Sequence, residues 1–378
     1  MLFITKEHLK PGMILARDIT LYSDDIFNTI LLTENQVLND IYINKIKFHD
    51  IPGAYIENKA FADVTVESNI NQRLEAKSLS EIKSVYYKFR NTMGKIDVST
   101  IKQISSVVDS LISEILVKKQ LSNNIVEFKN YDDYTYQHCL NVAMLSISTG
   151  VSLGLSEYML HELGMAGLLH DIGKMLIPLN IINKPDKLTK EEFDIMKTHP
   201  IKSVDQLEHL VSYDVLRGIE SHHEKVDGTG YPYGRKKDNI HLYGKILAIC
   251  DVYDALTSDR SYRKNCFPSE VIEYIMGCAD THFDYEILSK FLKNIVAYPV
   301  GTFVRLSNDK IGVVVKNFSE NIMRPVVRII NEDNTVGVDI DLLYDYNYMN
   351  ITITGMGYDY GKIDFNSISK AITELKKA

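Results

Sequence analysis

A histidine and an aspartate stand side by side at His170-Asp171, directly after the apolar run Leu163–Leu169. An imidazole nitrogen and a carboxylate oxygen both bind transition metals, so adjacent residues of these types can hold one ion together. Lys174 follows the pair, and on a continuing helix it would lie one turn further along the same face. More residues of the metal-binding types lie in the same long region of helical pattern. They are His138, His199, His222, His223 and Asp251.

Together these side chains predict a metal centre. Histidine nitrogen and carboxylate oxygen suit iron, manganese, zinc or nickel, and the lack of a cysteine ligand pattern argues against a structural zinc site. His138 alone would more often be a partly buried histidine than a ligand, and His222-His223 alone could be a loop pair. Asp251 is harder to dismiss, because a lone carboxylate in an apolar helix is costly to bury unless it is paired or bound to a metal.

The number of candidate ligands exceeds the need of one ion, so we expect two ions that share Asp171 as a bridge. Two metals held in this way lower the pKa of a bridging water and stabilise charge on phosphoryl oxygens. This is a common arrangement for the hydrolysis of phosphodiesters. Lys174 would add a further cation at such a site.

The composition limits the class of protein. The chain of 378 residues is longer than one average domain, and its 45% of apolar residues is ample for a core. A net charge of −8 argues against general binding to a nucleic acid polymer, which needs basic faces. Four cysteines without CxxC spacing are typical of buried thiols in a reducing compartment. We see neither a membrane span nor a signal peptide, so the sequence predicts a cytoplasmic protein without membrane contact.

Helices must position the candidate ligands. A capping pattern at Thr189, followed by two glutamates, begins one of them. The last helix carries both Asp251 and Asp254, which share a face because they are three residues apart. The expected helices cover residues 134–153, 157–169, 190 to about 199, 211–220 and 242–256.

The flanking segments have other patterns. Short apolar pieces at 14–16, 29–32 and 53–56, separated by Asp, Asn and Gly, predict strands. An apolar stripe from Ile101 to Ile115 predicts a helix that packs on its own domain, and the alternative is a connector that also pairs two subunits. Strand patterns with a turn at 307–309 predict a small barrel of SH3 type. The expected parts are a β-rich unit at 1–65, a helical connector at 66–120, a helical domain at 121–295, a β barrel at 296–355 and a tail with a short helix at 356–378.

Residues 121–295 resemble the HD-GYP domain, a branch of the HD phosphohydrolase superfamily, and this stretch is somewhat under half of the chain. The matching motifs are long and stand in the family's order. They are His138-Cys139-Leu140-Asn141-Val142-Ala143, Leu168-Leu169-His170-Asp171-Ile172-Gly173-Lys174, Met196-Lys197-Thr198-His199-Pro200, His222-His223-Glu224-Lys225-Val226-Asp227-Gly228-Thr229-Gly230-Tyr231-Pro232 and Asp251-Val252-Tyr253-Asp254-Ala255-Leu256-Thr257-Ser258-Asp259-Arg260.

The resemblance implies a mainly α protein with a helical HD-type, metal-dependent phosphohydrolase domain. It implies hydrolysis of cyclic di-GMP, a bacterial second messenger, to linear pGpG and in some members on to GMP. Lys174 would lie beside the scissile phosphate, and Asp171 would act in catalysis. Gly230, Tyr231, Pro232 and Arg260 would hold the substrate, with Arg263 as a further candidate, because an arginine fork suits phosphate or a guanine edge. The implied metal ligands are His138, His170, Asp171, His199, His222, His223 and Asp251.

One departure from the family bears on the metal count. Members with a third metal carry a glutamate one turn before the first histidine, and Tyr134 stands there in this chain. We therefore expect two divalent ions, iron or manganese, and pGpG as the product. Two alternatives stay open, namely a sensor that binds cyclic di-GMP with little turnover and an HD phosphohydrolase for another cyclic dinucleotide. A homodimer through the helical connector is a further expectation.

Overall fold

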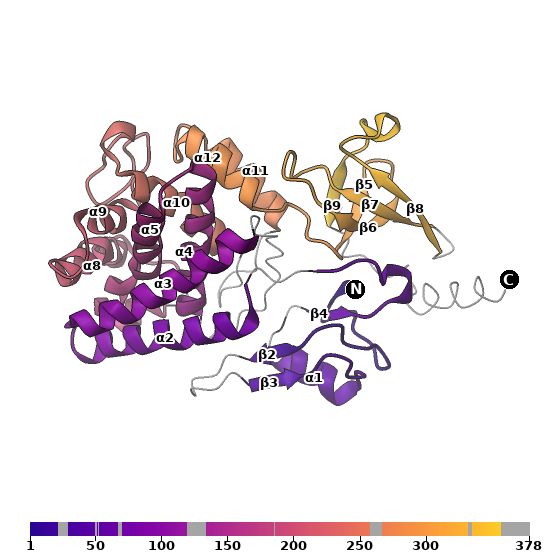
Figure 1. Ribbon diagram of the computed structural model, residues 1–378, viewed down its shortest axis with the longest axis horizontal. Helices are drawn as coiled ribbons and strands as arrows, with labels where there is room; N and C mark the ends of the chain where they lie inside the picture. Colours follow the sequence, from indigo (N-terminus) through magenta and orange to yellow (C-terminus); the bar gives the residue numbers. More distant parts are fainter. Residues whose placement is uncertain are drawn as a thin grey trace. The chain divides into compact units, whose positions relative to one another are not determined.

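The computed structural model describes residues 1–356, apart from 22–28, 50, 52, 67–69, 119–133, 185, 258–266 and 332–334. Contacts divide the described chain into two compact units. Unit 1 comprises residues 1–66 and 296–356, and unit 2 comprises residues 70–118 and 134–295. The two β-rich segments, which the sequence analysis treats as separate, thus group together, and the connector helices group with the helical domain (Figure 1).

Unit 1 begins with short strands that form two antiparallel pairs. The expected strands at 29–32 and 53–56 are present, whereas residues 14–16 form only isolated bridges, Ile14 to Val37 and Leu15 to Ile56. The elements are β1 (Leu2–Thr5) paired with β4 (Gly53–Ile56), β2 (Ile19–Leu21) paired with β3 (Thr29–Leu32), and helix α1 (Asp40–Phe48).

The second part of unit 1 is a five-stranded antiparallel sheet of order β8-β7-β6-β5-β9. Its edge strands β8 and β9 do not pair with each other among the described residues, so closure into an SH3-like barrel stays a prediction. The turn expected at 307–309 joins β5 to β6, and Asp309 there has a positive φ of 63°. The helix expected near the C-terminus lies outside the described residues. The strands are β5 (Phe303–Leu306), β6 (Ile311–Lys316), β7 (Val326–Ile330), β8 (Val336–Asp341) and β9 (Ile353–Met356).

A shared core and one arginine hold the two segments of unit 1 together. Leu2, Phe61 and Phe303 are nearly inaccessible and belong to one apolar cluster. Arg328 on β7 forms hydrogen bonds with the carboxylates of Asp63 and Asp339. Apolar burial and these ion pairs therefore join residues that are far apart in the sequence.

Unit 2 is helical and includes α4 (Tyr134–Leu153) and α5 (Glu157–Leu169). These two helices pack on each other and have the expected bounds. The apolar stripe of α3 is buried within this unit, where α3 packs against α2, α4 and α5. Every helix in the described part of the chain is too short or too polar to cross a lipid bilayer. The other helices are α2 (Gln72–Asn91), α3 (Val98–Lys118), α6 (Leu179–Ile182), α7 (Lys190–Met196), α8 (His199–Leu207), α9 (Tyr213–Ser221), α10 (Leu242–Thr257), α11 (Pro268–Gly277) and α12 (Tyr285–Phe291).

Candidate metal centre

The end of α5 delivers His170 and Asp171 to the interior of unit 2. The helix ends at Leu169, His170 is its C-cap, and a short 3-10 helix, η3 (Ile172–Leu176), follows. Lys174 is thus not on a continuation of α5. In a 3-10 helix, however, residues three apart are eclipsed, and Lys174 Nζ lies 2.5 Å from Asp171 Oδ2. The change of helix type therefore keeps the ammonium beside the carboxylate.

A glycine allows this turn to approach the next helix closely. A Cβ atom at Gly173 would lie 2.2 Å from the carbonyl oxygen of His199 and 2.7 Å from the amide of Ser203. The amide of Gly173 instead donates a hydrogen bond to Ser203 Oγ at 2.8 Å. Any side chain here would push the His170-Asp171 turn away from the start of α8, where His199 is the first residue.

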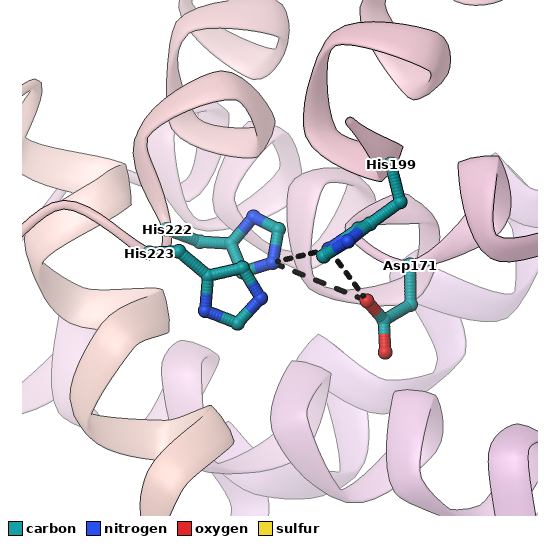
Figure 2. A group of neighbouring side chains, drawn as sticks. All are labelled: Asp171, His199, His222 and His223. Carbon is teal, nitrogen blue, oxygen red and sulfur yellow. Dashed lines mark hydrogen bonds and ion pairs between the residues drawn. The ribbon is translucent and has the colours of Figure 1, made fainter. Parts of the chain in front are cut away.

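The structure brings together all the histidines and aspartates that the sequence analysis marks as metal ligands. They come from α4, the end of α5, the start of α8, the end of α9 and α10, and all but His223 are buried. Figure 2 shows Asp171, His199 and His222 pointing toward one another, with His223 beside them. The ligand atoms form two close groups, and within each group they lie within 4.8 Å of one another. The groups are Asp171 with His199, His222 and His223, and Asp171 with His138 and His170.

Asp171 belongs to both groups, and Asp251 lies between them. Asp251 Oδ1 is 3.1 Å from His138 Nε2, and its Oδ2 is 3.8 Å from His223 Nδ1. Asp171 approaches His138 and His199 with different oxygens, Oδ2 at 3.8 Å and Oδ1 at 3.3 Å. Two carboxylates thus connect the histidines of one group with those of the other.

Hydrogen bonds to main-chain carbonyls fix the proton on three of the histidines. In each ring Nδ1 bonds to the carbonyl oxygen of the residue three positions earlier. A carbonyl oxygen only accepts, so Nδ1 carries the proton and the Nε2 lone pair of the neutral ring is free for a metal. The bonds run from His170 to Gly167 at 2.8 Å, from His199 to Met196 at 2.9 Å and from His222 to Ile219 at 2.6 Å.

The facing histidines are the clearest sign that the site suits a cation. His199 Nε2 and His222 Nε2 lie 3.4 Å apart, and with both protons on Nδ1 the two neutral rings have no hydrogen to share (Figure 2). Burial is the largest cause that lowers the pKa of His222 to about 3, and burial also lowers the pKa of His199. Both rings are therefore neutral near pH 7, with their lone pairs directed at each other.

Two buried atoms of the site also lack a hydrogen-bond partner among the described residues, namely His170 Nε2 and Asp171 Oδ1. An unsatisfied nitrogen and an unsatisfied carboxylate oxygen in the interior are costly unless something positive binds them. Burial alone would raise the pKa of Asp171, but the charge of Lys174 holds it well below its ordinary value. The carboxylate is thus ionised, and this donor set fits a divalent metal.

His138 is oriented by Asp254, a residue to which the sequence analysis gave no role. His138 Nδ1 lies 2.7 Å from Asp254 Oδ2, and Asn141 Nδ2 donates to Asp254 Oδ1 at 2.8 Å. Burial lowers the pKa of His138, but hydrogen bonds to Asp251 and Asp254 outweigh it and raise the value to about 8. The sequence signal for a role of Asp254 is its spacing of three residues from Asp251, which places both residues on the same face of α10.

The loop after α9 forms one side of the site. Tyr231 stacks on His223 with ring centroids 4.6 Å apart, and its amide donates to the carbonyl of His223 at 3.1 Å. A Cβ atom at Gly230 would lie 2.3 Å from the amide nitrogen of Lys225, so the loop requires glycine here. Pro232 follows Tyr231 through a cis peptide bond. The buried carboxylate of Glu224 accepts hydrogen bonds from the amides of Tyr233 and Arg235.

Three predictions fall outside what the structure describes. Arg260 and Arg263 lie in the stretch 258–266, outside the described residues. Tyr134 begins α4, but its side chain is also outside the description. The substrate-binding role of the two arginines and the argument about a third metal therefore stay predictions.

Comparison with known proteins identifies the helical region. Residues 116–287 match the family model of the HD domain. The cyclic di-GMP phosphodiesterase PA4108 of Pseudomonas aeruginosa is 39% identical over 227 residues, which are 60% of this chain and 55% of that protein. The 3'3'-cGAMP-specific phosphodiesterase 1 of Vibrio cholerae is 33% identical over 191 residues, which are 50% of this chain and 43% of that protein. The chain thus spans about half the length of these curated relatives.

A solved structure shares the fold. An HDG"Y"P protein from Bdellovibrio bacteriovorus aligns with a TM-score of 0.50 over 77% of this chain and 97% of that chain, at 16% identity. At this identity the likeness concerns the path of the backbone alone. The match extends beyond the helical region, because 77% of the chain is more than unit 2 contains.

Proposed function

We propose that this chain, which carries an HD domain at residues 116–287 and so belongs to the HD phosphohydrolase superfamily, hydrolyses a phosphodiester of cyclic di-GMP to give linear pGpG. The relative from Pseudomonas aeruginosa bears the name of this activity. The observation that carries the proposal is the position of Asp171. It is common to two groups of ligand atoms, and one of its oxygens is 2.5 Å from the ammonium of Lys174.

The proposed cofactor is a pair of divalent ions, iron or manganese, one for each group. Asp171 would be a ligand at both positions. One position would be completed by His199, His222 and His223, and the other by His138 and His170. When bound, such ions supply Lewis acidity toward phosphoryl oxygens and lower the pKa of water. Mixed imidazole and carboxylate donors favour these metals over calcium or magnesium, which prefer oxygen.

Lys174 and Tyr231 are the proposed contacts to substrate in the described part of the chain. The side chain of Lys174 is 28% exposed, and its ammonium is paired with buried Asp171. This cation would neutralise negative charge that grows on the scissile phosphate in the transition state. Tyr231, held flat against His223, offers an aromatic face to a guanine base.

The proposal is tested on the full chain, purified without oxygen and loaded with Fe(II) or Mn(II). Cyclic di-GMP is added and the products are separated by chromatography and identified by mass. We expect pGpG to accumulate, because the position of a third-metal glutamate is occupied by Tyr134. Asp171→Asn should abolish the reaction while circular dichroism shows that the helices persist. An active Asp171→Asn variant, or an inactive wild-type chain with a full metal complement, would contradict the proposal.

A second substrate deserves the same assay, because a relative at 33% identity is named for its specificity toward 3'3'-cGAMP. Both molecules are cyclic dinucleotides with the same backbone and differ in one base. The metal centre and Lys174 contact the phosphate, so they cannot distinguish the two substrates. Ratios of kcat/KM measured for both in one preparation decide which is preferred, and cyclic di-GMP is expected to be the better substrate.

A homodimer and a cytoplasmic location complete the proposal. Because the apolar stripe of α3 is buried inside unit 2, a dimer through these helices would use their exposed apolar residues. Tyr87 on α2 and Val117 on α3 are 65% and 82% exposed, and Met93, which follows the end of α2, is 85% exposed. Light scattering of the purified chain, repeated with Val117→Lys, tests this pairing.

A further inference from the structure

Tyr86, on the connector helix α2, contacts the backbone that leads into the metal centre. Its side chain is 0% exposed, and its hydroxyl donates a hydrogen bond to the carbonyl oxygen of Leu168 at 2.8 Å. The same hydroxyl lies 3.1 Å from the thiol of Cys139, which is adjacent to His138. One oxygen atom thus contacts both α4 and α5 next to their candidate metal ligands.

The carbonyl of Leu168 needs such a donor because it lies in the last turn of α5. The final carbonyls of a helix lack a partner within the helix, and an unpaired one in the interior is costly. At this helix end, His170 Nδ1 bonds to the carbonyl of Gly167, and Tyr86 bonds to the carbonyl of Leu168. Two side chains therefore fix the point where the chain leaves α5 and turns His170 and Asp171 into the site.

A second polar chain starts from the same helix and ends at His138. Each member is buried, and each is joined to the next by a hydrogen bond. Glu75 on α2 accepts from Gln137, and Gln137 also donates to Asn141. Asn141 donates to Asp254, which holds Nδ1 of His138. Helix α2 is thereby linked to ligands on both α4 and α5.

We propose that Tyr86 and Glu75 are positioning residues for the metal centre, Tyr86 through the end of α5 and Glu75 through the orientation of His138. This inference rests on the metal centre of the proposed function but not on the identity of the substrate. Under this proposal α2 does more than connect two parts of the chain, because the geometry of the metal ligands depends on the position of this helix.

Adjacent tyrosines make a matched test. Tyr86→Phe removes the buried hydroxyl, while Tyr87→Phe makes the same chemical change at a side chain that is 65% exposed. Both full-length variants are prepared metal-free, and their affinity for Mn(II) is measured by competition with a chelator. Loss of a group that orients a ligand typically weakens metal binding by about 10- to 100-fold. We expect a loss in this range for Tyr86→Phe and less than a twofold change for Tyr87→Phe.

Hydrogen exchange separates positioning from a general loss of stability. In the metal-free protein, Tyr86→Phe should speed exchange in residues 168–176 and leave the rest of unit 2 as in the wild type. In the assay with cyclic di-GMP, kcat should fall with KM unchanged. Glu75→Leu is a second variant, which should weaken Mn(II) binding several-fold and keep the inference testable if Tyr86→Phe does not fold.

The outcomes are distinct. If Tyr86→Phe and Glu75→Leu both bind Mn(II) as tightly as Tyr87→Phe, the inference is wrong. If the wild type binds Mn(II) but leaves cyclic di-GMP intact, the proposed function fails while the comparison of affinities still decides the role of α2. A wild-type chain that binds no divalent metal would overturn both.

Discussion

His199 Nε2 and His222 Nε2 face each other at 3.4 Å, while the opposite nitrogen of each ring is bound to a carbonyl. Neither ring can donate to the other without taking up a second proton, and burial opposes that proton on both. The arrangement is repulsive between lone pairs until a cation lies between them. The metal-free site is therefore expected to be a local weakness of unit 2.

Metal removal should lower the thermal stability of the chain. A ligand that binds only the folded state stabilises it by about 2.7 kcal/mol at a 100-fold excess over its Kd. We expect Mn(II) to raise the unfolding temperature and a chelator to reverse the rise, as followed by differential scanning calorimetry. His222→Ala should lose most of this shift, whereas His209→Ala, at an exposed position, should retain it. An unchanged shift in His222→Ala would count against the assigned ligand set.

Asp254→Asn should impair the centre through His138. An amide in place of the carboxylate can present an NH2 group to Nδ1 and favour the wrong tautomer. A loss of about 10- to 100-fold in metal affinity or kcat is typical when the partner of a ligating histidine is removed. Asp205→Asn on α8, where the side chain is exposed, is the control. Equal metal affinity in the two variants would show that Asp254 has no orienting role.

Lys174→Met should reduce kcat by about 100-fold or more, because removing one group that stabilises transition-state charge commonly costs 10²–10³. Metal binding should be affected far less, since Lys174 is not a ligand. Steady-state kinetics and metal analysis of the same preparation check both parts. Lys102→Met, exposed on α3, serves as the control for loss of one positive charge. A Lys174→Met variant with wild-type kcat would remove the lysine from the proposed site.

Tyr231→Ala should raise KM by up to about tenfold, which corresponds to the 0.5–1.5 kcal/mol of an aromatic stacking pair. Tyr231→Phe keeps the ring against His223 and should behave like the wild type. The ring of Phe193 lies 6.3 Å from that of Tyr231, so Phe193→Ala is expected to produce a smaller rise. Initial rates over a range of cyclic di-GMP concentrations provide the KM values, and a Tyr231→Phe variant as weak as Tyr231→Ala would contradict stacking.

Arg328→Met should loosen unit 1 by about 1 kcal/mol, the upper range for an ion pair that remains partly in solvent. The side chain of Asp63 is 64% exposed, and hydrogen bonding to Arg328 is the main cause that lowers its pKa. Because the pKa of Asp63 is lower in the folded state, its ion pair contributes stability at pH values above the ordinary pKa of about 4. This contribution is lost as the pH falls. Urea unfolding at pH 7 should thus give a lower free energy of unfolding for the variant than for the wild type, and this gap should narrow in acid. Arg305→Met, at an exposed position on β5, should show no such gap.

The helices that carry the candidate ligands were largely predictable, because local patterns specify them. The bounds of α4 and α5 follow from apolar periodicity and from Ser156, whose hydroxyl caps α5. His138 and Asp251 could be marked from the sequence because histidine and aspartate are common metal-binding residue types. Tyr86 was missed because its partner is a carbonyl of Leu168, 82 positions away, and no residue type marks such an acceptor.

The arrangement of unit 1 escaped prediction for a related reason. Arg328 and Asp63 are 265 positions apart, and a charged residue on a strand pattern does not indicate its partner. The change from α5 to the 3-10 helix at Ile172 was also unforeseen, and so was the close approach of Gly173 to His199. Contacts of this kind exist only once the chain has folded.

Asp171 belongs to both groups of ligand atoms, and this has a consequence for genetic dissection. If two cations bind as proposed, no replacement at Asp171 can remove one and spare the other, so an Asp171 variant reports only on the pair. Protein with only one metal position filled would have to be made by replacing His170 to empty one position or His199 to empty the other. Those two variants would reveal whether hydrolysis needs both positions or whether one is mainly architectural.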